Sequence, residues 1–288
     1  MRKLALAAVA MIACGVLPAH AQTLSLGFAK GAQYKYTLHI SGEGSLVTSA
    51  ITEAYKFDLG AVETVTVGSV GADGTAAVSV ALSKMSLKMT MNGTTNTTTP
   101  GTGGRPLELK IAPDGRVLSI YGIDVSTMPG YGLPGAGLPF AVLPDTAAKP
   151  GDTWSKKYDQ SDPNGGASTH VTAESEYLRD ETFGGVKAAV IETKSTATFS
   201  IVSGTLAAPV ASPSQGATTA TAPGFHGTGT ITSDVTSWID PGAHRVMRSV
   251  AKGATESSIT VGDPSSPLAQ GMGPLTIKVT STTNLEPA

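Results

Sequence analysis

The chain has 288 residues, with 20 basic and 22 acidic side chains and a formal net charge of −2. So few charges leave no electrostatic footprint for nucleic acid and no basic patch for an anionic membrane surface. The single cysteine, Cys14, lies in the leader described next, so the mature chain is expected to lack disulfides, thiol catalysis and thiolate metal sites.

Residues 1–21 have the pattern of a secretory signal peptide. Arg2 and Lys3 precede an apolar run over 4–17, and a small-x-small pattern ends at Ala21. The run is shorter than the roughly 20 residues that a permanent transmembrane helix needs. We therefore expect export to the periplasm or the extracellular space after cleavage near Ala21, with no transmembrane anchor.

A second interpretation of the leader concerns its cysteine. Met11-Ile12-Ala13-Cys14 resembles a lipobox, in which the cysteine is lipidated and becomes the new amino terminus. In this alternative the protein is a lipoprotein anchored to a membrane at Cys14.

The mature chain is dominated by alternating apolar and polar residues, which is typical of strands with one buried face. In the first half the pattern predicts strands at 34–40, 78–82, 85–91, 107–111 and 117–121. Apolar parity switches between the second and third of these, which predicts a bulge or bend near Ser83-Lys84. Pro113-Asp114-Gly115 predicts a hairpin between the last two.

The second half predicts further strands at 171–178, 186–194, 197–202, 228–239, 245–250, 257–261 and 275–283. No window has a helical period. Many strands joined by short polar turns predict an all-β, mainly antiparallel fold with little helix.

Two pairs of similar segments indicate an internal duplication. Thr75-Ala-Ala-Val78 is repeated as Lys187-Ala-Ala-Val190, and the segment from Ile111 to Val117 is echoed by the segment from Ile239 to Val246. We expect a duplicated curved sheet or a pair of half-barrels. The predicted boundaries are a first β-unit at 22–127, a Pro/Gly-rich apolar link at 128–150, and a second β-unit at 151–288 with a low-complexity insertion near 204–224.

Motifs for catalysis or cofactor binding are weak or absent in the sequence. Gly130-x-Gly132-x-x-Gly135 matches a dinucleotide fingerprint, but Pro134 and Pro139 oppose the helix that the fingerprint requires. The four mature histidines lack metal-site spacing, and no Gly-x-Ser-x-Gly elbow is present. We therefore expect no metal, no cofactor and no enzymatic activity.

Apolar positions with flexible side chains are the best candidates for ligand binding. The alternating stripe Met85, Leu87, Met89 and Met91 would give one sheet face polarizable thioethers that adapt to varied apolar ligands. Tyr131 and Phe140 of the apolar link are the other candidates. An ordinary sheet core is the alternative explanation of the stripe.

Part of the chain resembles a family of bacterial exported β-rich proteins of unknown function. The resemblance rests on Leu143-Pro144, on Pro150-Gly151-Asp152-Thr153-Trp154 and on the late hairpin Asp240-Pro-Gly242. The duplicated sheet is also remotely similar to the half-barrels of periplasmic lipoprotein carriers, whose concave face holds acyl chains. The resemblance implies a β-architecture in the cell envelope and an apolar concave face.

Three functions follow as hypotheses. The favoured one is a non-enzymatic envelope protein whose hydrophobic sheet face binds a lipid or another apolar small molecule. The second is a structural module that binds an envelope protein through its sheet edges and loops. The third is a hydrolase whose polar residues converge only in the folded chain.

Overall fold

The computed structural model describes residues 21–99, 105–125, 140–161, 167–203, 225–261 and 273–288. The predicted signal peptide up to residue 20, the lipobox cysteine Cys14, the candidate Tyr131 and the predicted insertion near 204–224 lie outside the described residues.

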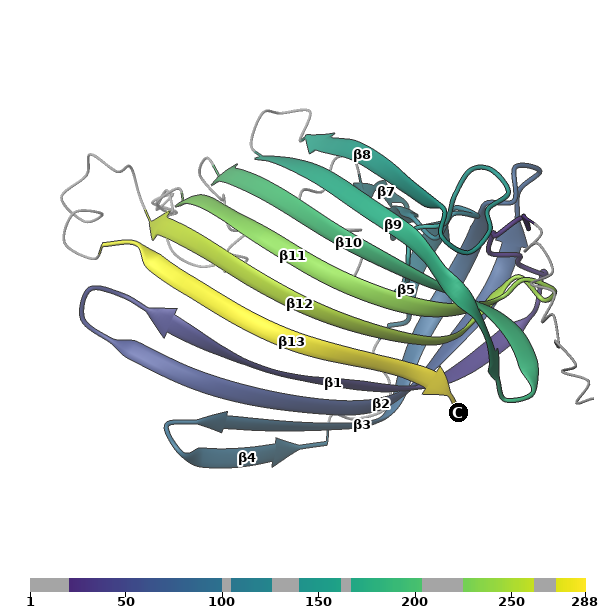
Figure 1. Cartoon of the computed structure of the whole chain (residues 1–288). Coiled ribbons are helices and arrows are strands. Elements are labelled where there is room, and N and C mark those ends of the chain that lie inside the picture. Colours follow the sequence, from purple (N-terminus) through teal and green to yellow (C-terminus); the bar gives the residue numbers. More distant parts are fainter. Residues whose placement is uncertain (1–20, 100–104, 126–139, 162–166, 204–224, 262–272) are drawn as a thin grey trace, which may run out of the picture.

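The described residues form one open antiparallel sheet of thirteen strands (Figure 1). The strands are β1 (Gln33–Val47), β2 (Thr52–Val70), β3 (Ala76–Met91), β4 (Thr94–Thr98), β5 (Leu107–Ile111), β6 (Val117–Ile120), β7 (Ile123–Asp124), β8 (Thr153–Ser161), β9 (Ala167–Phe183), β10 (Val186–Ser203), β11 (Phe225–Asp240), β12 (Arg245–Val261) and β13 (Leu275–Pro287). Their order is β7-β6-β5-β3-β2-β1-β13-β12-β11-β10-β9-β8, with β4 on β3. The described residues contain no α-helix, and the predicted all-β, mainly antiparallel fold is confirmed.

On each side of β13 neighbouring strands follow one another in chain order. One side reads β7-β6-β5-β3-β2-β1, with β4 beside β3, and the other reads β12-β11-β10-β9-β8. The similar segments Thr75–Val78 and Lys187–Val190 lie at the start of the third strand of each side, β3 and β10. A duplicated unit would produce this order, although the duplication itself stays a prediction.

Several strands are longer than their apolar patterns. The predicted segments 186–194 and 197–202 form the single strand β10, and 245–250 and 257–261 form β12. Backbone ladders on both sides continue through the polar residues between these segments. A polar stretch therefore does not end a strand whose neighbours supply the hydrogen bonds.

The expected irregularity at Ser83-Lys84 is present in β3. Lys84 has a φ of 50°, and the register between β2 and β3 shifts opposite it, between Gly60 and Val62. The additional residue compensates for the switch in apolar parity. Val80 and the stripe from Met85 to Met91 therefore point to the same face of the sheet.

The sheet has an apolar face and a polar face. Register places the even-numbered residues of β1, such as Leu38, opposite the odd-numbered residues of β2, such as Ala61, on the apolar face. The intervening residues, such as Lys56 and Asp58, point to the polar face. We call the end where β1 begins the near end, at the right of Figure 1, and the other the far end.

Most of the core lies on the apolar face at the near end, in two clusters, and a smaller third cluster joins Val171 of β9 to Ala197 of β10. One joins β1, β2, β3, β5 and β13 through residues such as Leu38, Val67 and Ile111. The other contains Tyr177 and Ile191 together with residues from two non-strand segments. The side chains of Phe28 and Phe140 pack against both clusters, so they join the two halves.

Two segments without strand structure fill the space between the clusters. Leu24 and Leu26 of the first segment are buried, as are Ala141 and Leu143 of the second. A pair of backbone hydrogen bonds between Gln22 and Ala148 ties the segments together. The described part of the predicted apolar link thus crosses the sheet at the near end and completes its core.

Candidate functional site

Beyond the near-end clusters the apolar face continues over the far half of the sheet, where Val171 and Ala197 form a small buried cluster with Tyr158 and Ile231 packed against it. Side chains from β2, β3, β10, β11 and β13 share this surface, which we call the apolar far face: Tyr55, Phe57, Leu87, Met89, Met91, Phe199, Ile231 and Val279. The members from β2, β10, β11 and β13 are half-buried. Their remaining cover is mostly supplied by neighbours in the same sheet.

Aromatic rings lie against glycines of the adjacent strand on this face. A Cβ on Gly42 would lie 2.6 Å from Phe57 Cζ, and a Cβ on Gly44 would lie 2.5 Å from Tyr55 Cζ. Gly229 has the same relation to Phe199, at 2.5 Å. Each glycine is the register partner of its ring. The rings therefore spread over the glycine backbone, which gives a broad and low apolar surface.

The predicted binding residues are divided between this face and the core. Met85 packs against the near-end core, Leu87 is half-buried, and Met89 and Met91 are 40% and 36% exposed. Phe140 belongs to the near-end core. The structure therefore brings Leu87, Met89 and Met91 together but separates Phe140 from them, and their role in binding stays a prediction.

Two large hollows lie on the opposite, polar face. Two adjoining grooves have volumes of about 980 and 890 Å³. From β3 they are lined by Lys88 and Thr90, whereas Met89 and Met91 line neither. Strands β2 to β4 and β10 to β12 contribute to the first groove, so the far half of the sheet curves toward its polar face.

This curvature corrects the expected hydrophobic concave face. At the near end the apolar face encloses a space that core side chains and the two non-strand segments fill. At the far end the concave side is polar. The cause is the twist of a long sheet, which makes opposite ends curve toward opposite faces.

Charged side chains on several strands face the first groove. They include the carboxylates of Glu43, Asp58 and Asp234 and four lysines: Lys56, Lys88, Lys194 and Lys252. Sequence reasoning missed this groove, although the alternation of Lys, Asp and Thr in the far halves of the strands carried the signal.

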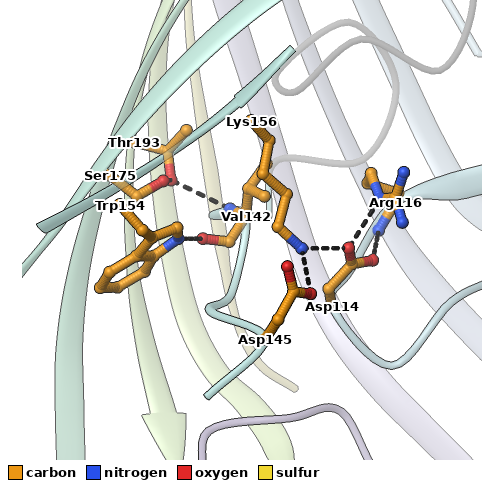
Figure 2. Close-up of polar contacts among 8 residues, drawn as sticks. All are labelled: Asp114, Arg116, Val142, Asp145, Trp154, Lys156, Ser175 and Thr193. Carbon is orange, nitrogen blue, oxygen red and sulfur yellow. Dashed lines mark hydrogen bonds and ion pairs between the residues drawn. The ribbon is translucent and has the colours of Figure 1, made fainter. Parts of the chain in front are cut away.

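A buried ion cluster lies at the near end (Figure 2). Lys156 Nζ lies 2.6 Å from Asp114 Oδ2 and 2.8 Å from Asp145 Oδ1, and Arg116 Nε also lies 2.6 Å from Asp114 Oδ2. The side chains of Lys156 and Asp114 are only 12% and 10% exposed. Burial raises the pKa of Asp114, but hydrogen bonds from Lys156 and the Arg116 backbone, with their charges, outweigh it and hold that pKa below its ordinary value.

Hydroxyl groups anchor the crossing segment beside this cluster. The backbone N–H of Val142 donates to Thr193 Oγ1 at 2.9 Å, and the Trp154 indole N–H donates to the Val142 carbonyl at 3.0 Å (Figure 2). Ser175 and Thr193 share a further hydrogen bond of 2.8 Å. Trp154 also packs against the near-end core. The ion cluster and these hydroxyls join the segment to the sheet, which is a structural role.

Glu63 is a buried acid on the apolar face. It is 4% exposed, and its Oε1 has no hydrogen-bond partner among the described residues. Burial raises the pKa of Glu63 to about 7. Neighbouring Tyr36 has its pKa raised by burial and by Glu63, and its hydroxyl donates to the Val246 carbonyl at 3.0 Å.

The part of the chain that the structure describes contains no group of three or more His, Cys, Asp or Glu side chains that could hold a metal ion. His226 and His244 lie at opposite ends of the sheet, on β11 and in the turn after it. His244 Nδ1 lies 3.3 Å from Ser25 Oγ, beside a cavity of only about 30 Å³. No ion pair of His244 with a carboxylate is present within the described residues.

Comparisons with known proteins give no family. No family model matches the chain, and no curated protein matches it. An outer membrane lipoprotein-sorting protein domain from Vibrio parahaemolyticus aligns with 12% identity over 88% of this chain and 83% of that chain, at a TM-score of 0.16. A DUF1329 family protein from Desulfovibrio piger aligns with 10% identity over 89% and 86%, at a TM-score of 0.14. Such low TM-scores carry no argument about function.

No helix in the described ranges is long and apolar enough to span a membrane.

Proposed function

We propose that the protein is an exported, non-enzymatic protein of the cell envelope that binds lipid acyl chains on its apolar far face. The observation that carries the proposal is the exposure of Met89 and Met91 beside their register partners Phe57 and Tyr55 on the apolar far face. Extended apolar surface of this kind marks interaction sites in soluble proteins.

The composition of the face suits acyl chains. Thioethers and aromatic rings supply polarizable, nonspecific contacts. The rings of Phe57 and Phe199 spread over glycines, so the surface is broad rather than pocketed. A chain lying across it would gain roughly 25 cal/mol for each Å² of apolar surface removed from water.

The predicted leader supports the location. A signal peptide ending near Ala21 would export the chain, and lipidation at Cys14 would instead tether it to a membrane. In both cases the apolar far face would work in the envelope, where lipids are the abundant apolar molecules.

The test is binding of a fluorescent fatty acid to the chain without its predicted signal peptide. Met89→Lys places a charge on the apolar far face and is expected to weaken binding at least about tenfold, or ~1.4 kcal/mol. The matched control is Ser86→Lys, an exposed position on the polar side of the same strand, which should bind as the wild type does. Equal affinity in all three proteins, or no binding by the wild type, would contradict the proposal.

A further inference from the structure

A cleft lies between the two open edges of the sheet, and the acyl-chain proposal does not use it. One edge is formed by β6 and β7, and the other edge is β8. Residues of β5, β6, β7 and β8 line the cleft, which has a volume of about 470 Å³. This volume is in the range of small-molecule sites. The side chains that define the apolar far face are not among its walls.

Tyr158 of β8 is a wall residue whose hydroxyl lacks a protein partner. Its ring packs against the buried pair Val171 and Ala197, which fixes the direction of the side chain. The hydroxyl oxygen is buried and has no hydrogen bond within the described residues. A buried hydroxyl without a partner costs free energy, so a molecule that supplied the missing hydrogen bond would be stabilised in the cleft.

The Tyr158 hydroxyl lies within electrostatic range of the Asp114–Arg116 ion pair. Burial raises the pKa of Tyr158, the Arg116 charge lowers it and the Asp114 charge raises it. Arg116, whose Nε lies 2.6 Å from Asp114 Oδ2, is itself a wall residue of the cleft. A guanidinium only donates hydrogen bonds, whereas a tyrosine hydroxyl donates or accepts. The cleft therefore combines both kinds of hydrogen-bonding group.

The charges in the walls of the cleft balance. Lys110 and Arg116 are opposed by Asp124 and Asp159, so the walls carry no net charge that would select an anion or a cation. Apolar side chains, those of Val117, Leu118 and Val125, complete the lining. Balanced charges beside apolar groups favour a neutral ligand that has both hydroxyls and C–H groups over an ion or a pure hydrocarbon.

We infer that this cleft binds a small neutral polyhydroxylated molecule, such as a sugar, which forms a hydrogen bond with the Tyr158 hydroxyl. Each hydroxyl of a sugar both donates and accepts, and its ring carbons carry C–H groups that pack against apolar side chains. The site goes beyond the proposed function, because it lies outside the apolar far face and does not depend on acyl-chain binding.

The experiment uses saturation-transfer NMR of the chain without its predicted signal peptide, titrated separately with glucose, maltose and N-acetylglucosamine. Y158F removes only the hydroxyl and is expected to weaken the affinity for the sugar that binds by about tenfold. Y55F removes a hydroxyl from the apolar far face, outside the cleft, and should leave that affinity unchanged.

A thermal melt without ligand separates binding from folding. Because the Tyr158 hydroxyl has no partner among the described residues, Y158F should melt at the wild-type temperature or above it. A lower midpoint would show that the hydroxyl already has a partner in the protein, and this would overturn the inference.

Three binding results would also overturn the inference: no saturation transfer to any of the three sugars, an equal loss of affinity in Y55F, or tighter binding of citrate than of the sugars. Citrate tests whether charge rather than hydroxyl groups selects the ligand. Fatty-acid binding is measured on the apolar far face with Met89→Lys, so failure of the acyl-chain proposal leaves the sugar titration interpretable.

Discussion

Replacing Glu63 by glutamine should remove a loss of folding stability that the wild type suffers as the pH rises. Glu63 is 4% exposed on the apolar face, with an Oε1 that lacks a partner among the described residues. Burial raises its pKa from 4.5 to about 7. Glu63→Gln keeps the shape of the side chain but removes its ionisation.

The magnitude follows from the two pKa values. Below pH 4.5 the acid is neutral in both the folded and the unfolded chain, so its ionisation does not affect stability. As pH rises from 4.5 to about 7, the unfolded chain ionises first and stability falls. At 1.36 kcal/mol per pKa unit, the loss above pH 7 is about 3 kcal/mol.

The assay is urea unfolding of the wild type and Glu63→Gln at about pH 4 and pH 8, outside the window between the two pKa values. We expect the free energy of unfolding of the variant, relative to the wild type, to be higher at pH 8 than at pH 4 by about 3 kcal/mol. Tyr36→Phe, which changes a neighbour without removing the acid, is the control and should keep the pH dependence. An identical difference between wild type and Glu63→Gln at both pH values would refute the reasoning.

Three further substitutions test the packing. Lys156→Met leaves the buried Asp114 with less compensation and should cost about 3–5 kcal/mol in urea unfolding; a cost below 1 kcal/mol would show that the pair is not buried. Thr193→Val removes the acceptor of the Val142 N–H and should cost about 1–3 kcal/mol, whereas an unchanged midpoint would disprove that hydrogen bond. Gly229→Val places a Cβ 2.5 Å from the Phe199 ring and should lower the thermal midpoint. Gly185→Val is the comparison for backbone strain, because Gly185 has a positive φ and an added Cβ there meets nothing within 4 Å.

The fold class could be predicted because its signal is local. Alternation over a few residues identifies a strand and its buried face, as in 34–40 of β1. The irregularity at Lys84 was also predictable, since the apolar parity switches there. Strand length was underestimated, because polar residues inside β10 and β12 obtain their hydrogen bonds from neighbouring strands.

The curvature could not be predicted from local patterns. Which side of the far half is concave depends on twist accumulated over many strands, and no single strand contains that information. The apolar stripe around Met89 was therefore assigned to a concave surface, whereas the grooves formed on the side of Lys88. The order of neighbouring strands decides which charges meet, as for Asp234, which stands in register with Lys194 and Lys252.

Contacts between distant segments were equally hidden. Lys156 of β8 meets Asp114 because the crossing segment that leads into β8 is hydrogen-bonded to the turn after β5, through the Leu143 N–H and the Asp114 carbonyl. Sequence reasoning identified Pro113-Asp114-Gly115 as a turn but had no means of finding its partner. The burial of Glu63 was also missed, because an acidic residue at an apolar position of an alternating strand is expected to interrupt the buried face rather than to belong to it.

The most direct test of the central claim is methyl NMR of the methionines with a spin-labelled fatty acid. Binding on the apolar far face should broaden the methyl signals of Met89 and Met91, which are exposed there, and leave that of buried Met247 on β12 sharp. Equal broadening of all three signals, or none with the fatty acid in excess, would contradict the account.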